Sequence, residues 1–375
     1  MTAAIDAPIP LVDLHWQHRQ VADDVAAGLA EVFEQTSFVN GPSVAAFEAE
    51  FAALSGARRC VGVANGTDAV ELALRAVGIE RDDTVVVPAN TFIASAEAIV
   101  RAGARPLLVD CDPVHQLIDV GAAVEAVDRH GARAVLGVDL FGQAAPLAEL
   151  ADRLTGSTCT LVQDGAQSQG ATHAGRGMGT IAAIAATSFY PGKNLGAYGD
   201  AGAVITDRDD LADRVKLLGD HGSRRRYHHE IVGMNSRLDT VQAVVLRAKL
   251  RHLPTWNEHR RAAADRYLEA LSDVDGVVAP VTRSDNEHVW HLFVVRVAER
   301  DRVLAALHAA GIGAGIHYPV PIHLQPAFAH LGHHAGDFPH AEAAAAEILS
   351  LPIFPGITPE QQDRVVAELL TAVSA

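Results

Sequence analysis

The chain contains very little lysine. Of its 30 basic residues only Lys193, Lys216 and Lys249 are lysines, and the other 27 are arginines. Chemistry that depends on a lysine amine therefore has three candidate residues. Basic residues are also outnumbered, since 46 acidic side chains give a net charge of −16. This surplus of negative charge excludes a general binder of nucleic acid or of anionic membranes.

Cysteine and long apolar runs are scarce as well. Cys60, Cys111 and Cys159 are odd in number, far apart and set in apolar segments, which supports neither a disulfide framework nor a zinc site. The first ten residues lack the pattern of a signal peptide, and we find no stretch of about 18 apolar residues that would span a bilayer. These features predict a cytoplasmic protein without a bound metal.

Apolar residues alternate between helical and strand patterns along most of the chain. Helical spacing over residues 21–53 is interrupted by a turn at residues 37–42, and a strict alternation of strands and helices follows. Alternation of this kind predicts an α/β fold with a mostly parallel sheet and helices on both faces. The predicted strands cover residues 60–63, 84–87, 106–109, 134–138, 160–162 and 184–187, and the helices between them begin near residues 67, 92, 120 and 147.

The domain organisation follows from where this alternation stops. We assign residues 1–250 to a large domain and residues 251–375 to a smaller C-terminal α+β domain. The boundary falls within one long helical pattern that runs from Leu238 towards Tyr267, and the second part contains a strand at residues 291–296 and a helix at 301–310. A run of alanines at residues 341–345 reads as helix.

Of the three lysines, Lys193 has the most constrained setting. It lies in a loop bent by glycine and proline directly after the predicted strand at residues 184–187, at the sheet edge where open α/β folds bind ligands. Lys216 and Lys249 lie beside arginines in amphipathic helical patterns, which is typical of a solvated helix face. A loop lysine taken alone is more often structural than catalytic. Whether Lys193 is catalytic therefore has to be judged from the residues at the other strand ends.

Asp164 follows a buried strand, where an unpaired carboxylate pays a large desolvation cost. A cationic partner would offset that cost, and an aspartate paired with a protonated pyridine nitrogen is what makes pyridoxal phosphate an electron sink. The alternative interpretation is a helix N-cap, which is common for aspartate at a strand-to-helix turn.

Two further strand ends carry groups suited to a phosphate and an aromatic ring. Gly66 and Thr67 open a helix, whose free N–H groups and dipole attract phosphate, and Ser188 adds a second hydroxyl. Asp68 is suited to capping the same helix. Phe92 follows another strand and offers a stacking surface, although a phenylalanine at that position is more often part of the core.

Eight segments, taken in order, resemble the DegT/DnrJ/EryC1/StrS sugar aminotransferases. Each is weak by itself, but together they extend over essentially the whole chain. They are residues 66–69, 164–167, 188–196, 199–200, 233–239, 290–293, 317–325 and 350–352. Gly165 stands where the family usually has alanine, and Ala201 stands where it usually has glycine. Both exchanges replace one small residue with another.

The resemblance implies a fold-type I aminotransferase that binds pyridoxal phosphate and works as a homodimer. By position, Lys193 forms the Schiff base with the cofactor, and Asp164 holds the ring nitrogen. The remaining implied cofactor contacts are Gln167 to the phenolic oxygen, Phe92 stacked on the ring, and Gly66, Thr67 and Ser188 at the phosphate. Asn235 is implied to reach the phosphate of the neighbouring subunit, and Tyr318 and His323 to face the substrate.

The same resemblance predicts the reaction. L-Glutamate gives its amino group to the cofactor, and a nucleotide-linked sugar then accepts it in ping-pong fashion. The forms of residues 235–239 and 318–323 resemble the branch that acts on 3-keto sugars, so the predicted acceptor is a dTDP-3-keto-6-deoxyhexose. Amination at C4 remains an alternative. Arg224, Arg225 and Arg226 form the densest basic segment and are candidates for binding the nucleotide diphosphate, with a solvated loop as the alternative.

Two other classes of function compete with this prediction. A sugar dehydratase on the same scaffold would carry histidine in place of the Schiff-base lysine, and Lys193 argues against it. A non-catalytic regulatory protein would not be expected to keep the full set of Lys193, Asp164, Ser188 and Thr67.

Overall fold

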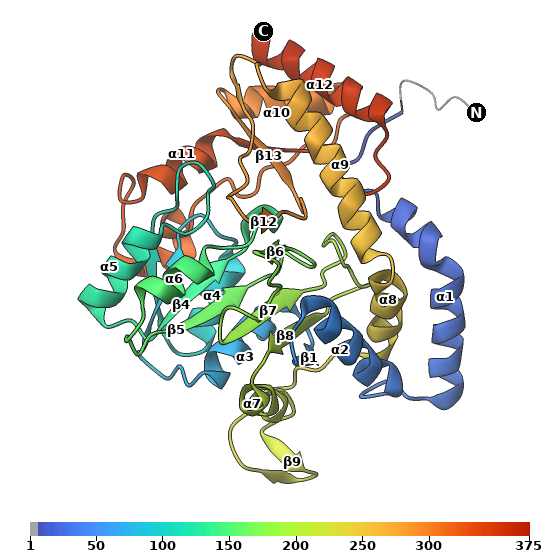
Figure 1. Ribbon diagram of the computed structural model, residues 1–375, viewed down its shortest axis with the longest axis vertical. Helices are drawn as coiled ribbons and strands as arrows, with labels where there is room; N and C mark the ends of the chain where they lie inside the picture. Colours follow the sequence, from blue (N-terminus) through green and yellow to red (C-terminus); the bar gives the residue numbers. More distant parts are fainter. Residues whose placement is uncertain (1–6) are drawn as a thin grey trace.

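A computed structural model describes residues 7–375. The chain enters through two helices, α1 (Leu14–Gln35) and α2 (Pro42–Ser55), as their apolar spacing predicts. Asp13 caps α1 by accepting a hydrogen bond from the backbone N–H of Trp16 at 2.9 Å. Figure 1 shows a central sheet surrounded by helices, with a smaller C-terminal unit above it.

The central sheet has seven strands in the order β1-β8-β7-β5-β4-β2-β3. All neighbouring pairs are parallel except those that β8 makes with β1 and β7, so the prediction of a mostly parallel sheet is confirmed. Strand β8 was missed by the sequence analysis. The bounds are β1 (Arg59–Val63), β2 (Thr84–Pro88), β3 (Arg105–Val109), β4 (Ala134–Val138), β5 (Thr160–Asp164), β7 (Ile184–Ser188) and β8 (Gly202–Thr206).

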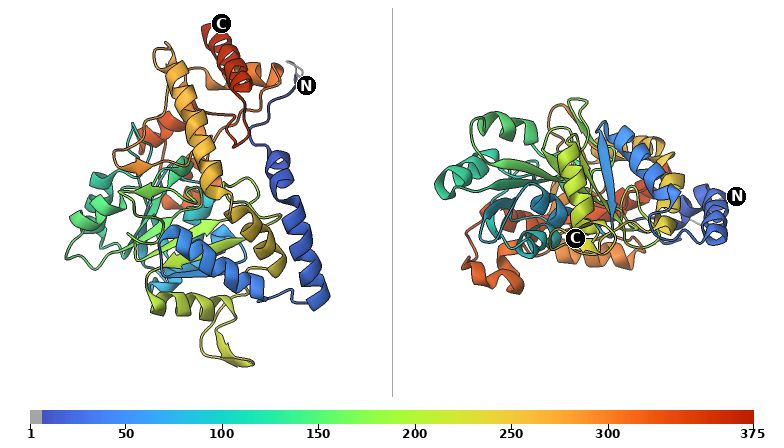
Figure 2. Two further views of the ribbon diagram at one scale, coloured as in Figure 1. Left: turned by 45° about the vertical axis from the view of Figure 1, so that its right-hand side comes forward. Right: turned by 90° about the horizontal axis from the view of Figure 1, so that it is seen from below.

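Helices cover both faces of this sheet, as Figure 2 shows from below. Helices α3 (Gly66–Ala76), α4 (Ile93–Arg101) and α7 (Asp209–Gly219) share one core with the side chains of Val85 and Val87. Val86 points to the opposite face, where α5 (Val120–His130) and α6 (Leu147–Arg153) pack. Because both faces are covered, the strands are nearly continuous apolar runs.

The C-terminal unit is built around a three-stranded antiparallel sheet with the order β11-β13-β14. Its own core contains Tyr267, Phe293 and Leu349. The elements here are α9 (Leu253–Leu271), β11 (Val277–Val278), β13 (Phe293–Val297), α10 (Arg300–Ala309), α11 (Pro339–Glu347), β14 (Ile348–Leu351) and α12 (Pro359–Ser374). The short elements are β6 (Thr172–His173), β9 (Ser223–Arg225), β10 (His228–His229), β12 (Asn286–Glu287), η1 (Leu140–Gly142), η2 (Ile322–Leu324) and η3 (Pro326–Leu331).

The single long helical pattern predicted at the domain boundary forms two helices in the structure. The pattern from Leu238 towards Tyr267 breaks at residues 251–252, where α8 (Thr240–Leu250) ends and α9 begins. Pro254 explains the break, because a proline fits the first turn of a helix but disrupts its interior. The boundary that we proposed at residue 250 falls at this point, and it stays a proposal. Ile9, however, bridges to Ile312 and packs in the C-terminal core, although it lies in the first 250 residues.

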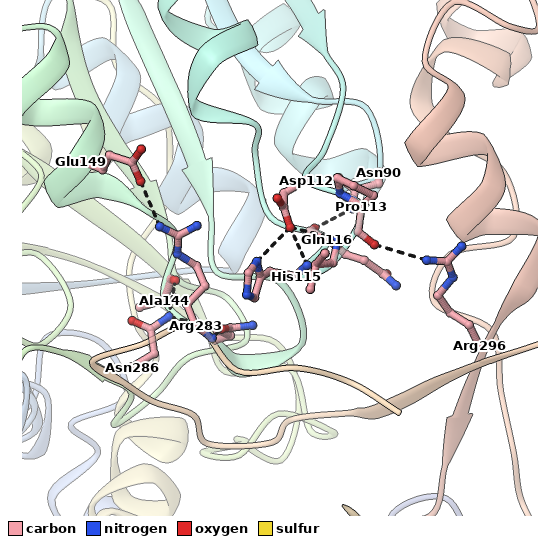
Figure 3. A network of polar contacts seen from close by, with 12 residues as sticks. Asn90, Asp112, Pro113, His115, Gln116, Ala144, Glu149, Arg283, Asn286 and Arg296 are labelled. Carbon is pink, nitrogen blue, oxygen red and sulfur yellow. Dashed lines mark hydrogen bonds and ion pairs between the residues drawn. The ribbon is translucent and has the colours of Figure 1, made fainter. Parts of the chain in front are cut away.

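Polar contacts join the two units. Figure 3 shows Arg283 paired with Glu149 at 2.9 Å, while Arg296 of β13 donates to the backbone oxygen of Pro113 at 3.2 Å. Arg296 also pairs with Glu347 at 2.7 Å. Within residues 7–375, no helix combines the length and apolarity needed to cross a membrane.

Candidate active site

A cavity of about 570 Å³ lies where the parallel strands of the large sheet end. Strands β4, β5 and β7 and the start of α3 all deliver side chains to it, because the carboxyl ends of parallel strands meet at one edge. The structure thereby brings together eight of the residues singled out in the sequence. They are Gly66, Thr67, Phe92, Asp164, Gln167, Ser188, Lys193 and Tyr318.

Lys193 projects from the tight loop that follows β7. The loop is closed by hydrogen bonds from the backbone N–H of Lys193 to the oxygen of Tyr190 at 2.8 Å and from Ala197 to Phe189 at 2.7 Å. Burial lowers the pKa of the Lys193 amine to about 8, and the nearby Asp164 carboxylate opposes this shift. An amine with that pKa exchanges protons near neutral pH, as a general base must.

Asp164 ends β5 and is only 6% exposed. Its Oδ2 accepts a hydrogen bond from the Ser95 hydroxyl at 2.7 Å, and its Oδ1 accepts one from the backbone N–H of Ala166 at 3.1 Å. Burial raises the pKa of this carboxyl, and the two hydrogen bonds and the charge of Lys193 counteract the rise. No helix follows Asp164, since residues 165–170 form turns, so the alternative role as a helix N-cap does not apply.

The start of α3 lies against the end of β7. Asn65, and not Asp68, caps the helix by accepting a hydrogen bond from the Asp68 N–H at 2.8 Å, while Asp68 pairs with Arg101. A Cβ on Gly66 would lie 2.5 Å from the Cβ of Ser188, so only glycine allows this close approach. The approach brings the first turn of α3, with its free N–H groups, beside the Ser188 hydroxyl.

Two aromatic rings stand at the cavity. Phe92 precedes α4 and is 49% exposed, so it is not the core residue that the alternative interpretation supposed. Its ring centroid lies 5.0 Å from that of Tyr318. The Tyr318 hydroxyl accepts a hydrogen bond from the side-chain amide of Gln167 at 3.1 Å, and the Gln167 oxygen accepts one from the N–H of Phe141.

Five predicted residues lie outside this cavity. Asn235 is exposed and forms a backbone bridge with Asp220. His323 is buried, with its Nε2 2.9 Å from Oε1 of Glu342. The three arginines, Arg224, Arg225 and Arg226, are exposed on or beside strand β9, which extends beyond α7 at the lower end of the molecule in Figure 1.

The sequence analysis missed several residues around Lys193. Ser95 is one helical turn beyond Thr91, and only the fold shows that it reaches Asp164. His291 and His317 both line the cavity, and burial followed by the charge of Lys193 lowers the pKa of each, that of His317 to about 4. These imidazoles are therefore neutral at physiological pH.

The other two lysines differ from each other. Lys216 is half exposed, 3.5 Å from Glu48, in agreement with a surface position. The prediction of a solvated face for Lys249 is wrong, because the residue is 2% exposed. Helix α8, which carries it, packs against both α1 and α2.

Residues 20–370 match the model of the DegT/DnrJ/EryC1/StrS aminotransferase family. The chain belongs to this family. The resemblance seen in the sequence is thus confirmed, together with the aminotransferase fold class, the enzymatic character and pyridoxal phosphate as the cofactor.

Individual relatives of this DegT-family chain match it over almost their whole length. The erythromycin biosynthesis sensory transduction protein EryC1 of Saccharopolyspora erythraea is 44% identical, covering 96% of this chain and 98% of the relative. The dTDP-3-amino-3,4,6-trideoxy-alpha-D-glucose transaminase of Streptomyces venezuelae is 43% identical, with 98% and 97% covered. The crystal structure of S. venezuelae DesV in complex with a ketimine intermediate superposes with a TM-score of 0.94 at 42% identity, with 98% and 99% covered.

Proposed function

We propose that this chain transfers the amino group of L-glutamate to a nucleotide-linked 3-keto-6-deoxyhexose, most simply a dTDP sugar. The observation that carries the proposal is the meeting of Lys193 and Asp164 in one cavity, with a helix start and two hydroxyls at its wall. The sugar assignment is supported by the 43% identity to a dTDP-3-amino-sugar transaminase.

The cavity fits pyridoxal phosphate. A buried carboxylate calls for a cationic partner, and the protonated ring nitrogen of the cofactor would supply one to Asp164. Thr67, Ser188 and the first N–H groups of α3 would hold the phosphate without any positively charged side chain. Phe92 presents an exposed ring towards the same space. Bound there, the cofactor supplies an electron sink for the electron pair left when a proton departs from the amine-bearing carbon.

The side chains around the cavity would carry out the proton transfer and tune the charges near it. The Nζ of Lys193 accepts the departing proton and returns it, because its lowered pKa leaves part of the amine unprotonated near neutral pH. The hydrogen bonds from Ser95 and Ala166 favour the ionised form of Asp164, which would keep the ring nitrogen protonated. The neutral imidazoles of His291 and His317 add no positive charge beside Lys193, which would otherwise lower its basicity further.

We infer a homodimer in which each active site takes residues from both subunits. Asn235 is exposed and outside the cavity of its own subunit, as a residue that serves the neighbouring site would be. In an equal mixture of Lys193→Ala and Asn235→Ala subunits, random pairing makes half of the dimers hybrid, and each hybrid has one intact site. About a quarter of the wild-type activity should then return. No gain over the separate variants would contradict the shared site.

The arginines at and beside β9 are proposed to bind the nucleotide diphosphate. Replacing Arg224, Arg225 and Arg226 with glutamine should raise the KM for the sugar nucleotide and leave the KM for glutamate unchanged. An unaltered KM for the sugar nucleotide would identify the segment as a solvated loop. The cytoplasmic location remains a prediction.

A regulatory role is the second candidate, since one relative carries the name of a sensory transduction protein. One experiment separates the two functions. The purified protein should absorb visible light through its lysine-bound cofactor, lose that absorbance with glutamate, and aminate a 3-keto sugar nucleotide in preference to its 4-keto isomer. Lys193→Ala should abolish both the bleaching by glutamate and the amination of the sugar nucleotide, and Lys216→Ala should preserve both. Bleaching and turnover that persist in Lys193→Ala would refute the assignment, and preference for the 4-keto isomer would move amination to C4.

A further inference from the structure

Lys249 is a buried cation whose role the mechanism above does not include. It lies on α8 at 2% exposure, and no carboxylate in the described residues 7–375 is within ion-pair distance of it. Its Nζ donates to the backbone oxygen of Gly196 at 2.6 Å and lies 4.6 Å from the ring centroid of Tyr198. Burial lowers the pKa of Lys249 to about 8. A buried charge without a counter-ion does not favour folding, so its presence points to another role.

The carbonyl that Lys249 binds belongs to the loop of the Schiff-base lysine. Gly196 is three residues beyond Lys193, and a Cβ on it would lie 2.2 Å from the backbone oxygen of Pro191. The Lys193 N–H bonds to Tyr190 within the same tight loop. Because the loop is folded this closely, a shift of the Gly196 carbonyl must displace the backbone at Pro191 and with it the base of the Lys193 side chain.

Helix α8 contacts the same loop a second time. Gln242 lies seven residues, or about two helical turns, before Lys249 and therefore on the same face of α8. Its side-chain oxygen accepts from the N–H of Tyr198 at 2.8 Å, and its side-chain nitrogen donates to the oxygen of Tyr198 at 3.2 Å. The two α8 side chains thus hold the segment directly after Lys193.

The residue next to Lys193 is fixed from another direction. The side-chain nitrogen of Asn194 donates to the oxygen of Val289 at 2.8 Å and to Oδ1 of Asn257 on α9 at 3.0 Å. Asn194 is 1% exposed. The backbone around Lys193 is therefore held by α8 and α9, while the lysine side chain itself points into the cavity.

We propose that Lys249 is a positioning residue of the amino-transfer reaction, which binds the Gly196 carbonyl and thereby fixes the loop from which Lys193 acts. The inference rests on the proposed function. Lys193 must carry a proton at its Nζ in each half-reaction, and over the full cycle it must also release the cofactor in the first half-reaction and bind it again in the second. A side chain that moves this much needs a fixed base, since misplacement by about 1 Å costs up to about a hundredfold in rate.

Lys249→Met tests the proposal, because methionine fills similar space but removes the charge and the hydrogen-bond donor. The expected result is a single-turnover rate about tenfold lower in both half-reactions, by the same factor, with the KM for the sugar nucleotide changed by less than about twofold. The unfolding temperature of the apoprotein should stay the same or rise, because a desolvated charge is removed. Lys216→Met, the same substitution on the exposed face of α7, should match the wild type in every measurement.

Several outcomes would overturn the inference. Wild-type rates in Lys249→Met, or a loss confined to one half-reaction, would exclude positioning of Lys193, and a lower unfolding temperature that accounts for the lost activity would assign Lys249 a structural role. Should Lys249→Met fail to fold, Gln242→Leu must lower the single-turnover rates of both half-reactions by the same factor. Unchanged or unequally lowered rates in Gln242→Leu would overturn the inference too. If the wild type itself shows neither visible absorbance nor turnover, it is the proposed function that fails.

Discussion

The hydrogen bond from Ser95 to Asp164 offers a sharp test of how the acid–base chemistry is arranged. Ser95 has one hydroxyl proton, and it donates this proton to Oδ2 of Asp164 at 2.7 Å. In its other contact, at 2.9 Å, Thr91 must therefore be the donor and Ser95 the acceptor. Ser95→Ala removes one of the two hydrogen bonds that favour the ionised form of Asp164 against the effect of burial, so the pKa of the carboxyl should rise.

The size of the effect follows from the type of bond. A hydrogen bond to a charged group contributes about 1.5–3 kcal/mol, and each 1.4 kcal/mol is about tenfold in rate. If the ionised carboxylate is needed to hold the ring nitrogen proton, Ser95→Ala should lower kcat about tenfold or more. Because a raised pKa keeps Asp164 protonated to higher pH, the acid limb of the pH–rate profile should move towards higher pH.

The assay is the pH dependence of kcat/KM for glutamate, measured from about pH 5 to 9 with wild type and variant saturated with cofactor. Thr91→Val is the matched control, since it removes a neighbouring hydroxyl that reaches Asp164 only through Ser95. Its acid limb should move less than that of Ser95→Ala. An acid limb unchanged by Ser95→Ala, or moved equally by both variants, would refute the reasoning.

Two further predictions concern the phosphate site and the buried lysines. Gly66→Ala should weaken binding of pyridoxal phosphate to the apoprotein about tenfold, because the new Cβ would lie 2.5 Å from that of Ser188 and overpacking costs about 1–3 kcal/mol; an unaltered Kd in a cofactor titration would contradict this. Lys193 and Lys249 have pKa values lowered from 10.5 to about 8, so the unfolded apoprotein binds more protons than the folded one between these values. Stability in urea should therefore rise from pH 8 to 10.5, by about 3 kcal/mol for each lysine at most, and the double Met variant should lose this rise.

The central fold was predictable because its physics is local. Strands buried on both faces must be continuous apolar runs, and the helices between them must be amphipathic, so β1 to β5, β7 and the helices between them left a clear pattern. The gathering of Lys193, Asp164 and Ser188 followed from parallel pairing alone. Strand β8 carries the same apolar pattern, but its antiparallel direction depends on the tight loop at residues 189–201, which periodicity does not reveal.

Lys249 shows why other features were not predictable. Its neighbours Arg247 and Arg251 suggested a solvated face, but residues two apart on a helix point about 200° apart. Arg247 pairs with Glu50 at the surface, whereas Lys249 points inward to Gly196. That α8 packs against both α1 and α2 is a tertiary fact, and no local pattern of α8 carries it. Ser95 was missed for the same reason, since its partner Asp164 is 69 residues away.

The distribution of positive charge leads to one more conclusion about the substrate. In the proposed function neutral donors would hold the phosphate of the cofactor, and Lys193 is the only lysine or arginine among the described residues that line the cavity. The densest cationic segment, Arg224 to Arg226, lies outside that cavity and extends past α7. If these arginines bind the nucleotide diphosphate, we propose that they do so at the cavity of another copy, because they do not line the cavity of their own. Neutralising them in one subunit of a hybrid dimer should raise the sugar-nucleotide KM at the site of its partner.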